Sequence, residues 1–373
     1  MYLCLFCAII SSCKDERMCN INPNYGNNVD SNRISIRDYT KKTIFVGDNI
    51  GNRPLTSQVV RVSGVEKYYM LDDEKMYIFD WENGHLCDSI ILKKSGKLNN
   101  YSGFNVITED SILLYNYSRK TIQYVNKKGE IFKTIELKNA KSLYTDIEAL
   151  NYSKIQIINN NIIASGSTLG DTRDRRALRK SASVTINVSS VEAQSLLQYP
   201  EIYRKADWGG VYMNTVYHTS SSRYMFYSFP IDHNVYKVDI LNRSVSSFFM
   251  GSKYCQCICS NSGDFLEEFM DKDKRIKYYL REHSYSMILY DEYRKQLIRV
   301  AEHPTEVMNE DGTFAKPFSI IISDMNGKIL SESKIIEDAM ELDLLNMHIT
   351  KQGLVIALIQ KDENIIVFKC FKL

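Results

Sequence analysis

The chain has 373 residues, of which 44% are hydrophobic, enough to bury the core of one large β domain or two ordinary domains. Its 47 basic and 45 acidic residues give a formal net charge of +2, so the chain has no global field that would attract nucleic acid. Twenty-five tyrosines and fifteen phenylalanines, with only six prolines, favour extended strands.

A short apolar stretch, residues 3–10, opens the chain and ends in Ile10-Ser11-Ser12-Cys13. A helix needs about 20 apolar residues to span a bilayer, so residues 1–12 are interpreted as a cleavable signal peptide. The end of this stretch resembles a bacterial lipobox, which implies that Cys13 is lipidated and becomes the first mature residue. The alternative is an ordinary buried N-terminal strand, and Met1-Tyr2 lacks the basic residue that normally starts a leader.

Residues 18–32 are rich in asparagine and have no apolar period. This composition is typical of a flexible tether or of an ordinary surface loop. We therefore predict a lipidated Cys13 and a tether over residues 13–32, followed by a folded domain over residues 33–373.

Pairs of short strands recur along this domain. Four stretches each combine an apolar strand, a polar turn and a second alternating strand, which predicts a β-hairpin: residues 76–92, 122–137, 235–250 and 319–335. Less regular units occupy residues 162–197 and 353–373. Repeated antiparallel units of this size predict an all-β fold, a β-propeller of six blades. A pair of β-sandwiches would explain the alternating strands but not six similar hairpins.

Two further segments refine this prediction. The last unit contains three strands, and residues 33–40 are free to supply a fourth, which would close the ring and remove two exposed edges. Residues 262–283 have apolar residues at helical spacing and predict one inserted helix around residues 264–282. This helix could be a lid on a central pocket or a cover over apolar blade surface.

Three closely spaced cysteines, Cys255, Cys257 and Cys259, would share one face of a strand. Three thiolates on one face could hold a soft metal. However, no fourth ligand stands at a suitable spacing, and cysteine is among the most buried residue types. We therefore favour a strand whose cysteines face the core, and we predict no metal site.

No known catalytic motif is present: the chain has no G-x-S-x-G, no H-E-x-x-H and no phosphate loop. The six histidines stand singly and are interpreted as surface or blade-edge residues: His85, His218, His233, His283, His303 and His348. Catalytic residues stay unknown, and no cofactor is predicted.

Three stretches are candidates for ligand binding. Residues 170–181 form a basic loop that could meet an anionic glycan or a phospholipid head group, or could simply be solvated. Trp208 lies in the tyrosine-rich stretch 207–229, which suits stacking on sugars or flat ligands but also suits a plain blade hairpin.

The third candidate follows the predicted helix and contains Tyr290, Tyr293, Arg294 and Arg299. Loops at blade ends often carry function, arginine offers a planar fork for an anion, and tyrosine offers a stacking face. A site under the helix is one interpretation. The alternative is that Arg294 pairs with Asp291 or Glu292 to fix a turn, while the tyrosines fill the blade.

Residues 285–304 and 316–330 resemble a Bacteroidetes lipoprotein family, the domain of unknown function 4221. The resemblance implies a six-bladed propeller and carries over no catalytic residue. We expect an outer-membrane lipoprotein of the cell envelope, periplasmic or surface-exposed, that binds a glycan, a peptide or an envelope protein. The alternative is a propeller hydrolase or lyase, which would need Asp, Glu, Asn or His side chains from several blades to converge on the axis.

Overall fold

The computed structural model describes residues 17–27, 37–48, 50–72, 74–92, 101–137, 146–167, 181–261, 271–308 and 314–373. The leader, Cys13 and residues 170–180 of the predicted basic loop lie outside the described residues. Among the helices in the described ranges, none is long and apolar enough to cross a membrane.

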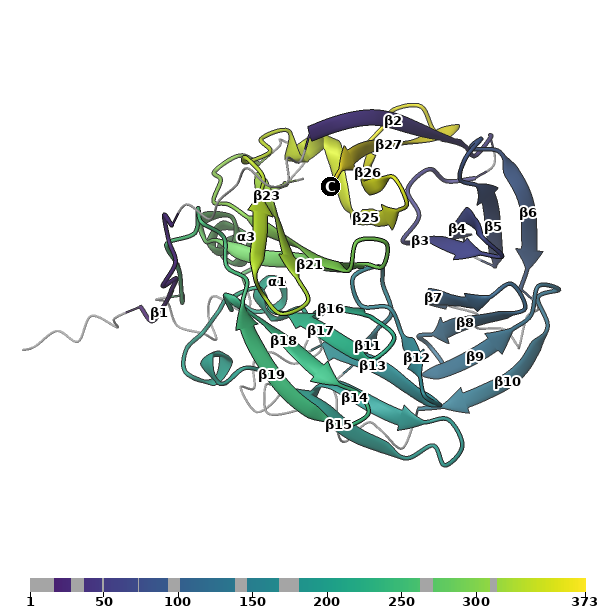
Figure 1. Cartoon of the computed structure of the whole chain (residues 1–373), viewed down its shortest axis with the longest axis horizontal. Helices are drawn as coiled ribbons and strands as arrows, with labels where there is room; N and C mark the ends of the chain where they lie inside the picture. Colours follow the sequence, from purple (N-terminus) through teal and green to yellow (C-terminus); the bar gives the residue numbers. More distant parts are fainter. Residues whose placement is uncertain are drawn as a thin grey trace, which may run out of the picture.

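Six antiparallel sheets surround a central axis, and each forms one blade of a β-propeller (Figure 1). Blade 1 consists of β3 (Thr56–Val62), β4 (Val65–Asp72), β5 (Lys75–Asp80) and β6 (Leu86–Ile91). Blade 2 consists of β7 (Tyr101–Thr108), β8 (Ser111–Asn116), β9 (Thr121–Val125) and β10 (Ile131–Glu136). Blade 3 consists of β11 (Asp146–Glu148), β12 (Gln156–Ile158), β13 (Asn161–Ser167), β14 (Ser181–Asn187) and β15 (Ala193–Gln198), and both β11 and β12 pair with β13. Blade 4 consists of β16 (Tyr217–Ser220), β17 (Tyr224–Ser228), β18 (Asn234–Asp239) and β19 (Ser244–Phe249). Blade 5 consists of β21 (Ser284–Asp291), β22 (Gln296–Glu302), β23 (Phe318–Asp324) and β24 (Ile329–Glu332). Blade 6 consists of β25 (Leu342–Thr350), β26 (Gly353–Leu358), β27 (Ile365–Lys372) and, at its outer edge, β2 (Arg37–Phe45).

The predicted hairpins are confirmed as pairs of neighbouring strands within the blades. The four regular ones form β5–β6, β9–β10, β18–β19 and β23–β24, and the less regular units form β13–β15 and β26–β27. The first strand of a regular hairpin is an apolar run where both of its faces pack against neighbouring blades, as in β5, which has four consecutive buried residues. The predicted all-β, six-bladed propeller is therefore correct.

The ring closes through the N-terminal strand, as predicted. β2 pairs with β27 in an antiparallel ladder from Arg37 opposite Lys372 to Phe45 opposite Ile365. The described strand covers residues 37–45, so it extends further than the predicted segment 33–40. The amide of Phe45 also donates to the carbonyl of Gly84 (2.8 Å), at φ 79° in the β5–β6 turn. A Cβ on Gly84 would lie 2.1 Å from the carbonyl oxygen of Thr43, so this contact between blades 6 and 1 requires glycine.

The apolar core lies between neighbouring blades. Phe79 of blade 1 and Phe368 of blade 6 share one buried cluster, which also contains Ile44 of β2. Further clusters join blades 1 and 2, blades 2 and 3, blades 3 to 5, and blades 5 and 6. Each blade is thus held by the apolar faces of its two neighbours.

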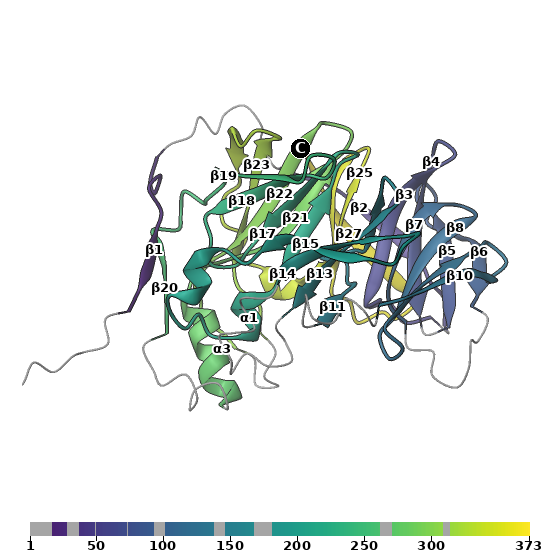
Figure 2. The same ribbon diagram turned by 90° about the horizontal axis from the view of Figure 1, so that it is seen from below.

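The two ends of the ring differ. The first strands of all blades run in the same direction, and the short helix α1 (Val211–Asn214) and α3 (Lys272–Arg281) precede β16 and β21. Both helices therefore lie where the inner strands begin, which we call the helix end, and Figure 2 shows them together on that side. The opposite end carries the turns after the inner strands and is called the turn end. The described part of the chain also contains two 3₁₀ helices, Glu201–Arg204 and Ala339–Glu341.

The predicted inserted helix is present as α3. Asp271 caps it by accepting hydrogen bonds from the amides of Asp273 and Lys274. Ile276 and Leu280, two of the apolar positions that indicated a helix, are buried. Residues 262–270 of the predicted segment lie outside the described part of the chain.

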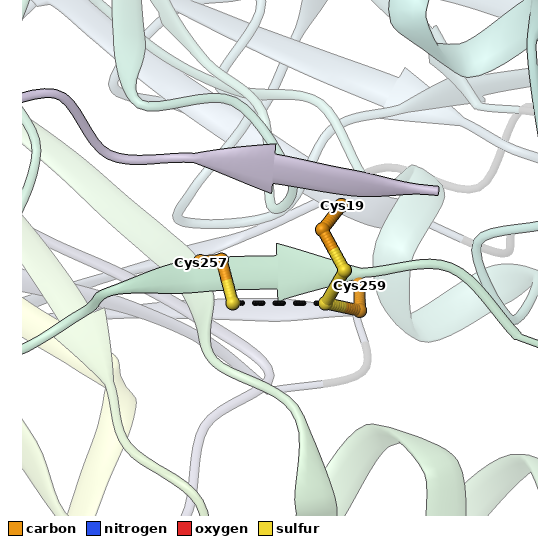
Figure 3. A group of neighbouring side chains, drawn as sticks. All are labelled: Cys19, Cys257 and Cys259. Atoms are coloured by element: carbon orange, nitrogen blue, oxygen red, sulfur yellow. Dashed lines mark hydrogen bonds between the residues drawn. A yellow bond between two sulfur atoms is a disulfide. The ribbon is translucent and has the colours of Figure 1, made fainter. Parts of the chain in front are cut away.

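The N-terminal segment 17–27 packs against the propeller, and we call it the N-terminal clamp. Its strand β1 (Cys19–Ile21) pairs with β20 (Cys257–Cys259), and a disulfide joins Cys19 to Cys259 (Figure 3). This part of the predicted tether 13–32 is therefore bound. The prediction that Cys255, Cys257 and Cys259 face the core is confirmed for Cys255, which is buried just before β20, and wrong for the other two. Within β20, Ile258 is fully buried, and Cys257 and Cys259 lie on the opposite face, where they are partly exposed and Cys259 meets Cys19.

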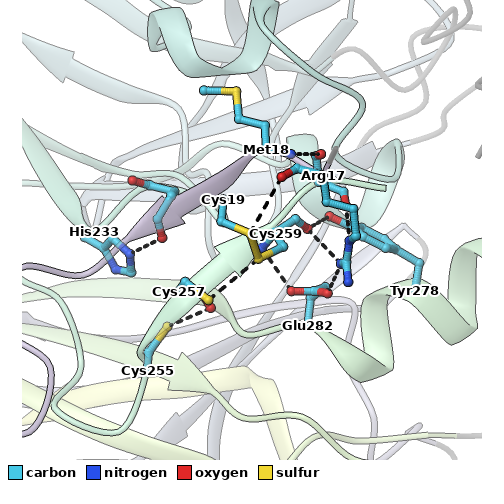
Figure 4. The surroundings of a disulfide bond; sticks show 11 residues. Arg17, Met18, Cys19, His233, Cys255, Cys257, Cys259, Tyr278 and Glu282 are labelled. Carbon is cyan, nitrogen blue, oxygen red and sulfur yellow. Dashed lines mark hydrogen bonds and ion pairs between the residues drawn. A yellow bond between two sulfur atoms is a disulfide. The ribbon is translucent and has the colours of Figure 1, made fainter. Parts of the chain in front are cut away.

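Polar contacts hold the clamp around this disulfide (Figure 4). Arg17 forms an ion pair with Glu282 and donates to the carbonyl of Ser260. The side-chain amide of Asn22 donates to the carbonyls of Ser252 and Cys255, both at 2.7 Å. The clamp is thus bound by a sheet, a covalent bond and buried hydrogen bonds.

Replacing Ile44 of the closing strand with alanine should destabilise the protein by about 2–5 kcal/mol, because Ile44 is fully buried between blades 6 and 1. Lys41→Ala on the same strand is the control, because the Lys41 side chain is exposed. Urea unfolding of both variants measures the difference. Equal losses of stability would show that β2 does not contribute to the core.

Candidate functional site

Polar side chains of the inner strands connect the blades near the axis. Ser57 of blade 1 donates from Oγ to Oδ1 of Asn346 in blade 6 (2.7 Å) and lies 3.0 Å from Nε2 of His348. Asn151 of blade 3 accepts from the amide of Ser57 (2.8 Å) and donates to Oδ1 of Asn346 (3.2 Å). Side chains from three blades therefore converge here, and all four are buried.

The same kind of contact continues around the ring. Gln58 donates to the carbonyl of Phe104 in blade 2 (3.0 Å), and Asn105 donates to the carbonyl of Ile155 in blade 3 (2.8 Å). His218 of blade 4 donates from Nε2 to the carbonyl of Lys154 in blade 3 (2.8 Å). We call these hydrogen-bonded inner-strand residues the axial collar. Because they use their polar atoms on one another, the collar joins blades instead of forming an open catalytic cluster.

The histidines are mostly interior residues, contrary to the prediction. His218, His233, His303 and His348 are buried, and His283 is partly buried, whereas His85 is exposed. Burial lowers the pKa of His218 to about 4 and that of His303 to about 3. It also lowers the pKa of His348, with a smaller contribution from the nearby Lys154. These imidazoles are therefore neutral structural groups at neutral pH.

Tyrosines and acids gather at the helix end of blades 3, 4 and 5. The rings of Tyr152 and Tyr217 lie 5.1 Å apart, and the Tyr152 hydroxyl donates to Glu148 (3.1 Å). Under α3, the Tyr279 hydroxyl donates to the buried carboxylate of Glu302 (2.5 Å). Burial and then Glu302 and Glu148 raise the pKa of Tyr217. These phenols therefore stay protonated and can donate hydrogen bonds.

Two lysines lie in this region. Lys316 is buried, donates to the carbonyl of Tyr279 (3.0 Å) and to Ser284 (2.9 Å), and has a pKa that burial lowers to about 8. Lys154 is partly exposed, and burial lowers its pKa to about 8 as well. Among the described residues, no carboxylate lies within ion-pair distance of the Lys154 amino group. Lys154 is thus a cation that a bound anion could reach.

A pocket of about 440 Å³ opens at the same end, between blades 1 and 2. It lies at the starts of the inner strands β3 and β7, and its lining is mixed in polarity. The lining includes Arg53, Leu55, Asp72 and Tyr101. Leu55 is 65% exposed, so the pocket presents apolar surface as well as charge.

Two of the predicted ligand-binding residues lie in the interior, which corrects the prediction. Trp208 is 2% exposed and donates from Nε1 to the carbonyl of Ile202 (3.0 Å). Arg299 is fully buried in blade 5, and its guanidinium lies 3.7 Å from the centre of the Tyr285 ring. Its five N–H groups bind blade 4 and the loop after it, through Ser228 Oγ and the carbonyls of Phe229, Asp232, His233 and Met250. No ligand can reach either side chain.

The other three predicted residues lie at the turn end, away from α3. Arg294 pairs with Asp291 (2.9 Å) and donates to the carbonyl of Lys351 (2.9 Å). The Tyr293 hydroxyl donates to Glu66 of blade 1 (2.6 Å), and the Tyr290 ring stacks with Phe226. The eight-residue strand β21 separates this turn from α3, so Arg294 and α3 cannot form one site. The alternative interpretation, an arginine that fixes the turn, describes the structure.

The cysteine cluster is the one group of three metal-ligating side chains found in the described ranges. The sulfur atoms of Cys19, Cys257 and Cys259 lie within 4.8 Å of one another. The disulfide uses two of them, which leaves one thiol. Sequence reasoning missed Cys19 as the third member because it lies 240 residues from Cys259 along the chain.

The fold and the collar define a six-bladed β-propeller that carries a group of partly exposed tyrosines, acids and Lys154 at its helix end. The chain belongs to the DUF4221 family, a domain of unknown function, whose family model matches residues 33–334. This result confirms the resemblance seen in the sequence.

Solved structures show the same fold. A member of the DUF4221 family from Bacteroides vulgatus ATCC 8482 has a TM-score of 0.77 and 18% identity, over 92% of this chain and 99% of that one. A protein of Bacteroides fragilis NCTC 9343 that carries the name of an exported protein has a TM-score of 0.55 and 12% identity, over 92% and 97%. No curated protein matches the chain.

Arg299→Met should destabilise the protein by about 3 kcal/mol or more, because several buried carbonyls would lose their donor. Arg223→Met in blade 4 is the matched control and should have a much smaller effect, since Arg223 is about half exposed in its ion pair with Asp239. Thermal and urea unfolding measure both. A stable Arg299→Met protein would contradict the assigned role of this arginine in joining blades 4 and 5.

Proposed function

We propose that this chain is a lipid-anchored binding protein of the cell envelope, with its ligand site at the helix end of the propeller. The expected ligand is a glycan that carries an anionic group. The observation that carries the proposal is the grouping at one end of the ring of partly exposed tyrosines, Glu148 and Lys154, which forms no ion pair with any described residue.

Envelope localisation is supported by three observations. The Ile10-Ser11-Ser12-Cys13 sequence resembles a lipobox. A disulfide joins Cys19 and Cys259, and disulfides persist in exported proteins but are rare in the cytosol. A structural relative carries the name of an exported protein.

A binding role is supported by the chemistry of the helix end. Tyrosine rings offer stacking faces and hydroxyl donors for sugars, and Lys154 offers a charge for a carboxylate or sulfate. The pocket beside Tyr101 and Arg53 adds a concave surface at the same end. The hydrolase or lyase alternative receives less support, because the converging axial side chains are hydrogen-bonded to one another.

Cys13→Ser should abolish lipidation and release the protein from membranes, because the thiol that would carry the lipid is removed. Labelling with a clickable fatty acid, followed by membrane fractionation, measures this. Cys87→Ser, which removes an exposed cysteine of the propeller, should keep the label and is the control. Unchanged labelling of Cys13→Ser would reject the anchor.

Lys154→Gln should weaken binding to anionic glycans on an array by roughly tenfold, because a charge-assisted contact is worth about 1.5–3 kcal/mol. Lys351→Gln is the matched control, since Lys351 is an exposed lysine at the turn end. Both variants should unfold at the same temperature as the parent protein. An array without any bound glycan, or loss of binding in Lys351→Gln alone, would reject a site at the helix end.

A further inference from the structure

The sulfur atoms beside the N-terminal clamp point to chemistry that the binding function does not require. The free thiol of Cys257 lies 3.6 Å from Sγ of Cys259, which is already bonded to Cys19. Figure 3 shows Cys259 between the other two sulfur atoms. Cys257 is partly exposed, so it can exchange its proton with solvent.

We propose that Cys257 is the attacking thiol of an internal disulfide exchange that releases the N-terminal clamp. The Cys257 thiol loses its proton to solvent, and the thiolate attacks Sγ of Cys259. A Cys257–Cys259 bond forms as the Cys19–Cys259 bond breaks, and Cys19 leaves as a thiolate that takes up a proton. One thiol and one disulfide are present before and after, so no external oxidant or reductant is needed.

The strand geometry permits the product. Residues two apart in a strand point to the same face and have Cα atoms about 6.6 Å apart. This separation lies at the upper end of the range that disulfides span, about 6.8 Å. The two Cβ atoms of a disulfide lie about 3.5–4.5 Å apart, closer than in an extended strand, so the exchange also needs a local bend in the backbone of β20. That bend would loosen the three-residue pairing of β20 with β1.

The other nearby cysteine is a poorer candidate for the attack. Cys255 is 1% exposed, and burial raises its pKa to about 12. Its sulfur contacts the backbone carbonyl of Cys257 (3.7 Å) and not the disulfide. Cys257 is thus the cysteine that is both accessible and adjacent to a disulfide sulfur.

Exchange would change what covers a neighbouring cavity. Asn24 and Asn27 of the clamp line a cavity of about 220 Å³, opposite Lys253 and Glu332 of the propeller. While Cys19 is bonded to Cys259, the clamp is fixed covalently beside this cavity. After exchange, non-covalent contacts alone hold it, among them the three-residue β1–β20 pairing and the polar contacts of Arg17, Asn20 and Asn22.

Peptide mapping of the full chain tests the exchange directly. The folded protein is incubated without added thiols between pH 6 and 9, quenched with acid, unfolded, alkylated with N-ethylmaleimide and digested with trypsin. Cleavage after Arg17, Arg33, Lys253 and Lys272 places Cys19 in peptide 18–33 and the other three cysteines in peptide 254–272. We expect a fraction of Cys19 to be alkylated, with fragmentation showing a Cys257–Cys259 bond in peptide 254–272.

Cys257→Ser should lower the alkylated fraction of Cys19 by roughly tenfold or more, because no adjacent thiol can then displace it. Cys87→Ser should match the parent protein, since Cys87 is a free cysteine in blade 1. Blocking Cys257 of the folded parent with N-ethylmaleimide before incubation should reproduce the loss without a mutation. Cys19 that stays crosslinked in the parent protein at every pH, equal release in Cys257→Ser, or a product that contains Cys255 would overturn the proposal.

Discussion

A ring of blades is stable only when it closes, and the pairing of β2 with β27 is the interaction that closes this one. Blades 1 and 6 share an apolar cluster that contains Ile44, Phe79 and Phe368, so the last interface forms only when both ends of the chain are in place. Closing so long a loop costs conformational entropy, although that cost grows slowly with loop length. The ladder and the shared cluster together offset it, which is why the N-terminal strand belongs to the C-terminal blade.

Polar groups set the relation between adjacent blades more specifically than apolar contact can. Apolar faces can slide, whereas Arg299 satisfies all five of its donors only when blade 4 and the loop after it lie in one position. The collar acts in the same way nearer the axis, through Ser57, Asn151 and Asn346. Interior positions that looked functional in the sequence thus define the blade geometry.

Local patterns predicted much of the fold. In the outer hairpins, such as residues 76–92, the first strand is an apolar run because both of its faces are buried, the second strand is mostly exposed, and the turn between them is short. Inner strands such as β16, Tyr217–Ser220, gave little signal because their polar side chains bind neighbouring blades. Which strands become neighbours across the ring depends on the whole fold, and no local pattern encodes that information.

The candidate site was less predictable for the same reason. Arg294 and Arg299 look alike in the sequence, yet one fixes an exposed turn with Asp291 and the other is enclosed by carbonyls contributed by residues 229–250. The β1–β20 pair was also missed, because each strand has three residues and the two lie far apart in the chain. The helix-end group around Tyr152, Tyr217 and Glu302 comes from separate blades, and of these three residues Tyr217 alone lies in a stretch that the sequence indicated.

The order of the two N-terminal attachments has a mechanical consequence. Cys19 precedes β2 in the chain. A pulling force applied on the N-terminal side of Cys19 therefore passes through the S–S bond into β20 before it can reach β2. The hydrogen bonds between β2 and β27 are then shielded from a force that would otherwise peel them apart. While the disulfide is intact, a force on the N-terminus is carried by β20. When the disulfide is broken, the same force reaches β2, the strand that closes the ring.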